Sequence, residues 1–366
     1  TFVNGTGAEL EVFGTYSNTG TVIQNDGVIR IEDGGAGTSQ NFTSSSSTVS
    51  YLEIEKTGGG TVNMVTTSLT VQNLTFNSGN TSTFLISSGK TLVLPNGTSI
   101  SNGTLEVAGG GTLQIGNGQT LLVNGGTFKT SGLSDSYPQN LAQKGKITTS
   151  GAGTWNFTAT SGTVNLVGFQ FDYVGTNGLN LGGSTTLANF ESGHFTNLSE
   201  SYSSLKVMQF NISNLPSTFD DIEWHWGPSN TPPAPADSYL LASSTGCGGN
   251  TLSFNNWWGD FFDDSLDTPD PDPNTKVSET NCDIVISWAN SPVSLVKLDA
   301  TGFEGEVLLE WATGLETGHL GFNVYRSQNP YSDFIQINDE LVRNNFLSLG
   351  PQGSYHFIDN NVTNGD

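Results

Sequence analysis

Positive charge is scarce in this 366-residue chain. It holds 11 Lys and Arg against 34 Asp and Glu, so the formal net charge at pH 7 is −23. The scarcity of Lys and Arg creates this imbalance, because the acidic content is ordinary. Such a surface repels phosphate backbones and anionic lipid headgroups, so we expect no nucleic-acid partner and no binding to a membrane surface.

Long apolar runs are also missing. No run approaches the ~20 residues of a membrane-spanning helix, so the sequence predicts no membrane insertion in this segment. The chain begins with Thr1 rather than methionine, and no signal peptide is visible. We therefore expect a processed or cut chain.

Cysteine is limited to Cys247 and Cys282, which fall in the same irregular region. Neither has a His or a second Cys at metal-ligand spacing, so we predict a disulfide between them, with two free buried thiols as the alternative. A disulfide and a surface rich in Ser, Thr and Asn together indicate an extracellular or cell-surface location.

Glycine and patterned apolar residues are abundant. The 46 glycines would suit a flexible chain, yet 21 Phe and 7 Trp are more than disordered chains carry. The clearest pattern is a Thr-Leu-x-(Val/Ile) tetrad that starts at Thr104, Thr112 and Thr120, each time followed by a glycine-rich turn. Period-two alternation places the two apolar residues of each tetrad on one face of a short strand. These inward residues are Leu105 and Val107, Leu113 and Ile115, and Leu121 and Val123.

Two architectures fit such strands. Asn117-Gly118 and Asn124-Gly125 suit hairpin turns, so a meander is one alternative. The turns vary while the tetrad stays constant, however, and three strands joined by tight turns can close one coil of about 24 residues in a β-solenoid. We favour the solenoid. Similar alternating segments occur over residues 1–90 and 153–183, whereas Leu133–Lys146 lacks alternation and is expected to be a loop that projects from one coil.

The repeats resemble the pectin-lyase-like right-handed parallel β-helix, in particular the Gly/Thr/Asn-rich coils of bacterial surface proteins and adhesins. The resemblance covers residues 1–290 and implies an all-β fold. Within it, residues 197–290 are richer in Trp and Pro, and we expect them to form an aromatic, disulfide-closed terminal region that covers the end of the solenoid.

Residues 291–366 form the second expected domain. The segments LVKLDA, VLLEW with Trp311, and GFNVYRS with Tyr325 resemble the first three strands of a fibronectin type III-like β-sandwich. FIQIND and SYHFID would be the next two strands. The final two strands of that family have no counterpart before Asp366, so we expect the natural protein to continue or to be cleaved here.

Several residues are candidates for chemistry. Asp263, Asp264, Asp267, Asp270 and Asp272 are the best calcium candidates, although the EF-hand spacing is missing and a solvated acidic loop is the alternative. Trp224, Trp226, Trp257 and Trp258 are candidates for stacking on glycans, with a place in the core as the alternative.

The same sequence lacks the signatures of polysaccharide-cleaving β-helices. Lyases of this shape use Arg or Lys as a base, and Arg30 is the one arginine before residue 290. The four histidines, which are His194, His225, His319 and His356, lie far apart without a nucleophile motif and are interpreted as surface or strand-face residues.

We therefore expect a non-enzymatic extracellular structural protein with no cofactor other than the candidate calcium. It would be a rigid rod in a surface fibre, filament or adhesin stalk, whose partners are other copies of itself joined head to tail or other surface proteins. The alternative is a carbohydrate-binding or polysaccharide-cleaving β-helix protein.

Overall fold

The chain folds into two compact units, Thr1–Ala289 and Asn290–Asp366. The structure is a computed structural model. It describes residues 2–20, 22–24, 26–33, 37–45, 48–135, 139–198, 206–212, 215, 218–226, 239–242, 251–259, 277–278, 283–288, 295–313, 321–327, 335–343 and 354–362. Among these residues, no helix combines the length and apolar character that a bilayer crossing requires.

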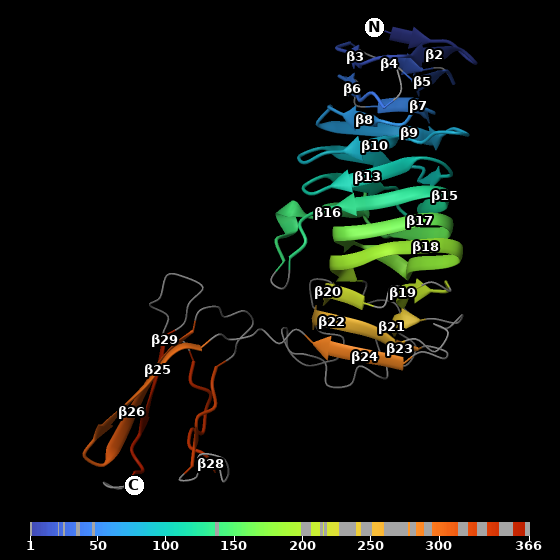
Figure 1. The fold of residues 1–366 in the computed structure, drawn as a ribbon. Helices are drawn as coiled ribbons and strands as arrows, with labels where there is room; N and C mark the ends of the chain where they lie inside the picture. Colours follow the sequence, from blue (N-terminus) through green and yellow to red (C-terminus); the bar gives the residue numbers. More distant parts are fainter. Residues whose placement is uncertain are drawn as a thin grey trace. The chain divides into compact units, whose positions relative to one another are not determined.

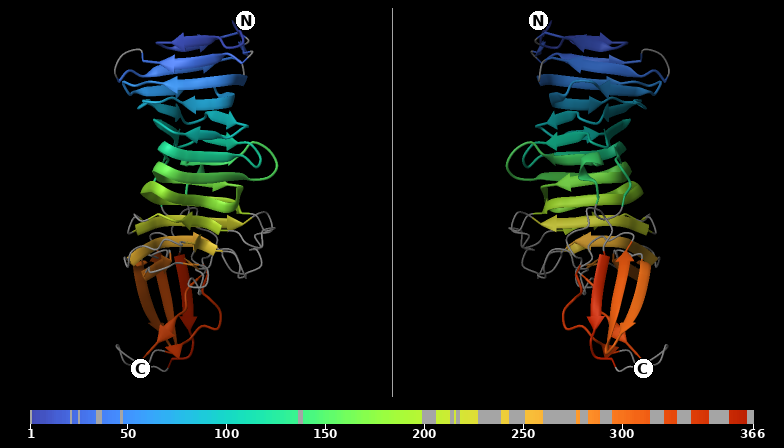
Figure 2. Two further views of the ribbon diagram at one scale, coloured as in Figure 1. Left: turned by 90° about the vertical axis from the view of Figure 1, so that its right-hand side faces the viewer. Right: turned by 90° about the vertical axis from the view of Figure 1, so that its left-hand side faces the viewer.

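The first unit is a parallel β-solenoid, whose strands lie one above another in successive coils (Figures 1 and 2). Its earlier strands are β1 (Phe2–Asn4), β2 (Glu9–Val12), β3 (Tyr16–Asn18), β4 (Val22–Gln24), β5 (Val28–Glu32), β6 (Gln40–Ser44), β7 (Thr48–Glu55), β8 (Thr61–Met64), β9 (Ser68–Phe76), β10 (Thr83–Ile86), β11 (Thr91–Leu94), β12 (Thr98–Ile100), β13 (Thr104–Ala108) and β14 (Thr112–Ile115). Its later strands are β15 (Thr120–Ser131), β16 (Gly145–Thr149), β17 (Trp155–Asp172), β18 (Val174–Leu198), β19 (Lys206–Phe210), β20 (Thr218–Trp226), β21 (Tyr239–Ala242), β22 (Thr251–Gly259), β23 (Val277–Ser278) and β24 (Asp283–Trp288).

Each coil contributes one strand segment to each of three parallel rows. The first row contains β2, β5, β12, β19 and β21, the second contains β3, β6, β8, β10 and β13, and the third contains β11, β14 and β16. The long strands β7, β9, β15, β17 and β18 run through a corner and belong to more than one row. The prediction of a β-solenoid is confirmed, and a meander of hairpins is excluded for this unit because its ladders are parallel.

The central repeat forms one coil, as the sequence predicted. Its three tetrads lie in β13, β14 and the start of β15, and Thr104 pairs with Thr83 of the preceding coil and Thr127 of the following one. All six predicted inward residues of the tetrads are fully buried. The turns need glycine for close packing: a Cβ on Gly116 would lie 1.9 Å from the carbonyl oxygen of Pro95 in the adjacent coil.

One column of the core changes from aliphatic to aromatic along the solenoid. Leu113 of β14 stacks above Ile147 of β16, and the next residue in this column is Phe171 of β17, followed by Phe195 of β18. The ring of Phe171 contacts those of Trp155, Phe169 and Phe195 at centroid distances of 5.5, 5.0 and 5.6 Å. These tilted and edge-on contacts are the arrangement that aromatic pairs prefer.

The second unit is a small antiparallel β structure. Its strands are β25 (Leu295–Phe303), β26 (Glu306–Thr313), β27 (Tyr325–Arg326), β28 (Ile335–Gln336) and β29 (Ser354–Asp359). β25, β26 and β29 form one sheet with β26 at its centre, and β27 pairs with β28 in another. Trp311 stacks on Tyr355, and Phe322 meets both rings edge-on, so these three aromatic side chains form its core.

Candidate functional site

The most distinctive polar site lies at the corner between the second and third rows of the solenoid. In each of three successive coils, the chain turns this corner at one residue with a left-handed backbone conformation. These residues are Gly168, Ser192 and Asp221, with φ values of 57°, 53° and 58°. The flanking residues are in register from coil to coil. In the coil before Gly168, the corner contains the whole segment from Gly132 to Lys144, which includes the 3₁₀ turn η1 (Leu141–Gln143). We call residues 133–144 the strap, of which 133–135 and 139–144 are described.

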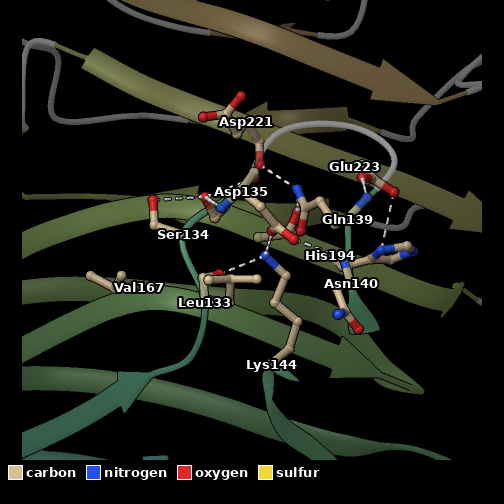
Figure 3. Close-up of polar contacts among 12 residues, drawn as sticks. Leu133, Ser134, Asp135, Gln139, Asn140, Lys144, Val167, His194, Asp221 and Glu223 are labelled. Carbon is tan, nitrogen blue, oxygen red and sulfur yellow. Dashed lines mark hydrogen bonds and ion pairs between the residues drawn. The ribbon is translucent and has the colours of Figure 1, made fainter. Parts of the chain in front are cut away.

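A loop leaves the coil between β15 and β16, as the sequence analysis expected, and this strap turns back toward later coils. It lies along the following coils and bonds to the second and third of them (Figures 1 and 3). The amide of Asp135 donates to Ser192 Oγ at 3.0 Å, and Ser192 Oγ donates to the carbonyl oxygen of Asp135 at 3.0 Å. The side-chain amide of Gln139 donates to the carbonyl oxygens of Asp221, at 2.6 Å, and Gly193, at 3.3 Å. The strap therefore joins coils that are distant in sequence.

A buried histidine–carboxylate pair lies beside the middle of the strap. Nδ1 of His194 lies 3.2 Å from Oε2 of Glu223, and these side chains are only 6% and 3% exposed. The other carboxylate oxygen of Glu223 accepts a hydrogen bond from the backbone amide of Gln139 at 2.9 Å (Figure 3). Because a buried carboxylate requires compensating partners, this bond fixes the strap to the His194–Glu223 pair.

A second buried charge closes the strap on itself. The ammonium group of Lys144 is fully buried, donates to the carbonyl oxygen of Leu133 at 2.9 Å and forms a short ion pair with Asp135. The other carboxylate oxygen of Asp135 accepts from the Asn140 amide at 2.8 Å. Lys144 thus holds the two ends of the strap together, as Figure 3 shows.

A polar face lies on the third row beside the strap. Lys146, Gln170, His194 and Glu223 occupy one column in register, at outward positions that alternate with the apolar core. Apart from Lys146, these side chains are buried although they point away from the core. Gln139 of the strap bonds to Glu223 and to the carbonyl oxygen of Gly193 beside His194, so we call this arrangement a clasp.

Asp172 forms the neighbouring column of this face. Its carboxylate is paired with the Lys146 ammonium at 2.9 Å and accepts hydrogen bonds from the hydroxyls of Thr148 and Thr196 and from the side-chain amide of Asn197. These four partners lie on β16 and β18, on either side of Asp172 in β17, so the network joins three coils across the ladder.

A simpler clasp occurs in the early coils. Oδ2 of Asp33 accepts hydrogen bonds from the hydroxyl of Thr57 at 2.7 Å and from the amides of Thr57 and Gly58 at 2.9 Å. These bonds, the Thr57 hydroxyl first, and the nearby charge of Lys56 lower the pKa of Asp33 below its ordinary value. The Lys56 ammonium is fully buried, 3.6 Å from the other oxygen of Asp33.

Most residues proposed from the sequence are not tested. Cys247, Cys282 and the five aspartates Asp263, Asp264, Asp267, Asp270 and Asp272 lie outside the described residues. The backbone of Trp224 is in register with Phe195, that of Trp226 with Leu198, that of Trp257 with Trp288 and that of Trp258 with Glu223. In the part of the chain that the structure describes, no three His, Cys, Asp or Glu side chains are placed to hold a metal ion.

Sequence analysis missed the pairing of His194 with Glu223. It interpreted His194 as a surface or strand-face residue, and the residue does occupy an outward position of its strand, yet the strap buries it. The two partners lie on neighbouring coils, one full coil apart in the sequence, so no local motif joins them. The one available signal was the non-alternating segment 133–146, which marked where a coil departs from the repeat.

The geometry thus defines the chain as a parallel β-solenoid protein with a strap across its coils and a second, small antiparallel unit. No family model, no curated protein and no solved structure matches this sequence.

Proposed function

We propose that this chain is a non-enzymatic structural protein, a rigid extracellular shaft in a surface fibre, filament or adhesin stalk. The observation that supports the proposal is the unbroken stack of inward side chains, from Ile29 in an early coil to Phe219 in a late one. Coils stacked in register through parallel ladders make a stiff body, because bending must separate backbone hydrogen bonds and core contacts together.

The strap contributes to this mechanical role. Its bonds to Ser192, Gly193, Asp221 and Glu223 run along the solenoid axis, in addition to the ladders between coils. A force that pulls neighbouring coils apart has to break the strap as well as the ladders. In this mechanism the buried His194–Glu223 pair is an anchor of the shaft.

Finer features belong to the same proposal. The coils are right-handed, as parallel crossover connections are in ~98% of cases. The second unit is a fibronectin type III-like sandwich, an assignment supported by the contacts of Phe322 with Trp311 and Tyr355, which are neighbours on the three-stranded sheet. The Cys247–Cys282 disulfide, the calcium site and the partner surface proteins remain predictions from sequence.

Electron microscopy of native material, without recombinant truncation, tests the shaft. We expect straight rods, isolated, anchored at one end or joined into filaments with a regular repeat. Compact, non-elongated particles would contradict the proposal. Added calcium and chelator should be compared in the same experiment, because a calcium-bearing shaft would change its length or order with the ion.

The second candidate function is binding or cleavage of polysaccharides. The observation that favours it is the polar face formed by Lys146, Gln170 and Asp172, where charged and amide groups line one sheet. Retention on arrays of acidic and neutral glycans, measured for the wild-type chain and for Lys146→Ala, would reveal such binding. Equal and negligible retention of both chains removes this candidate.

A further inference from the structure

The outer side of the second row forms a regular face. One column consists of threonines that pair in register through six successive coils, and the adjacent outward column is mainly polar. We call these two columns the threonine face. Its first column is Thr61, Thr83, Thr104, Thr127, Thr163 and Thr186, and its second is Asn63, Leu85, Glu106, Lys129, Asn165 and Asn189.

The charges of this face cancel one another. Lys129 lies 3.0 Å from Glu106, and these are the charged residues of the two columns. The outer face of the first row differs, because Glu11, Glu32, Glu53 and Glu55 gather there around Arg30. In a chain of net charge −23, two copies repel each other over most of their surface, so a neutral face is where they can approach.

The arrangement of the columns is also self-complementary. Three threonines precede the midpoint of the Glu106–Lys129 pair and three follow it. A twofold axis in the plane of the face, parallel to the strands and midway between β13 and β15, leaves strand direction unchanged and inverts the order of the coils. It places Glu106 opposite Lys129 of a second copy, and Thr104 opposite Thr127.

We propose that the threonine face is a lateral docking surface for a second copy of this chain, with the two solenoid axes antiparallel. The contact is isologous, because each member of the charge pair meets the other member across the axis. Short Thr side chains permit close approach of two flat sheets, and side-chain amide ladders such as Asn165–Asn189, bonded at 3.1 Å, are common in stacked sheets. Such lateral pairing is independent of the head-to-tail joining expected from the sequence.

The size of the face sets the expected affinity. Six strands ~4.8 Å apart and ~4 residues long span about 24 by 13 Å, well below the ~800 Å² per partner of a standard interface. We therefore expect a weak dimer, with a dissociation constant in the high-micromolar range, that gains importance where copies are held at high local density.

A matched pair of substitutions in one strand tests the surface. Thr127→Arg places a bulky positive group in the centre of the threonine face, and Thr120→Arg places the same group on the first row of the same strand, β15. In sedimentation equilibrium up to the solubility limit, we expect a wild-type dimer, unchanged dimerisation of Thr120→Arg and at least ~10-fold weaker dimerisation of Thr127→Arg. A monomeric wild-type chain, or equal effects of the two variants, would overturn the proposal.

Charge exchange tests the position of the axis. Glu106→Lys alone brings two ammonium groups together across the axis, and Lys129→Glu alone brings two carboxylates together, so each variant should be monomeric. An equimolar mixture should form heterodimers, and the double variant should dimerise like wild type. Circular dichroism checks that both single variants fold. A mixture that stays monomeric while the wild type dimerises would refute the antiparallel arrangement.

Discussion

The coils before the strap and the coils beside it differ in their corners, in their core side chains and in the exposure of their outward polar side chains. Coils around the central repeat turn on short glycine-rich corners and enclose Leu, Val and Ile, with outward polar side chains half exposed. Coils from β16 to β20 enclose Phe and Trp, and the strap buries outward His194 and Glu223. The comparison shows that a solenoid can accept a long insertion at one corner when the insertion returns to the coils and bonds to them.

The two regions also differ in the exposure and in the hydrogen-bond partners of their carboxylates. In the early coils, Asp33 is partly exposed and accepts three hydrogen bonds from one neighbouring turn. Beside the strap, Glu223 is buried and depends on His194 and Gln139 from separate segments. The first arrangement is local and tolerant of change, whereas the second couples three segments.

The largest expected effect concerns the core. Phe171→Ala removes a ring that contacts Trp155, Phe169 and Phe195, and should lower the free energy of unfolding by ~3–5 kcal/mol. Leu113→Ala, in the same column of the aliphatic coils, should cost ~2–4 kcal/mol, because its smaller cavity is lined by fewer atoms. Urea unfolding of both variants measures the difference, and a smaller cost for Phe171→Ala than for Leu113→Ala would contradict this expectation.

The next effect concerns the strap. Glu223→Ala removes the carboxylate that pairs with His194 and accepts the hydrogen bond of the Gln139 amide, and loss of one member of a buried pair costs ~3 kcal/mol or more. Much of this loss should appear as local opening, seen as faster hydrogen exchange and proteolysis within residues 133–144. The control is Lys129→Ala, which breaks the more exposed pair with Glu106 and should cost ~0–1 kcal/mol in the monomeric chain. Equal protection of the strap in Glu223→Ala and wild type would disprove its anchoring role.

The sequence predicted the solenoid because its repeat is local. The tetrads at Thr104, Thr112 and Thr120 carry both the strand alternation and the turn glycines, and parallel pairing follows once the coil closes. The polar site could not be predicted in this way. Contacts such as that of Gln139 with Glu223 depend on the path of the strap over later coils, and that path is set by tertiary bonds rather than by periodicity.

The smallest effect is the pH dependence of the Asp33 clasp. Its hydrogen bonds, above all from the Thr57 hydroxyl, lower the pKa of Asp33, so the folded state binds this proton less readily than the unfolded state. The resulting stabilisation is complete above the ordinary Asp pKa and is lost as the pH falls through the lowered value. Glu32, beside it, has the opposite sign, because burial and then the carboxylates of Glu11 and Glu55 raise its pKa.

Substitutions at these two positions separate the opposing contributions. Asp33→Asn should have a lower free energy of unfolding than wild type. This difference should be greatest at neutral pH and should shrink on acidification below the ordinary Asp pKa. Glu32→Gln should be slightly more stable than wild type at neutral pH, and this gain should disappear as the wild-type carboxyl becomes protonated. Urea unfolding in a pH series measures both differences. If the difference in free energy of unfolding between Asp33→Asn and wild type does not depend on pH, the clasp stabilises the early coils through shape rather than charge. The Asp33 and Glu223 clasps would then differ in burial alone.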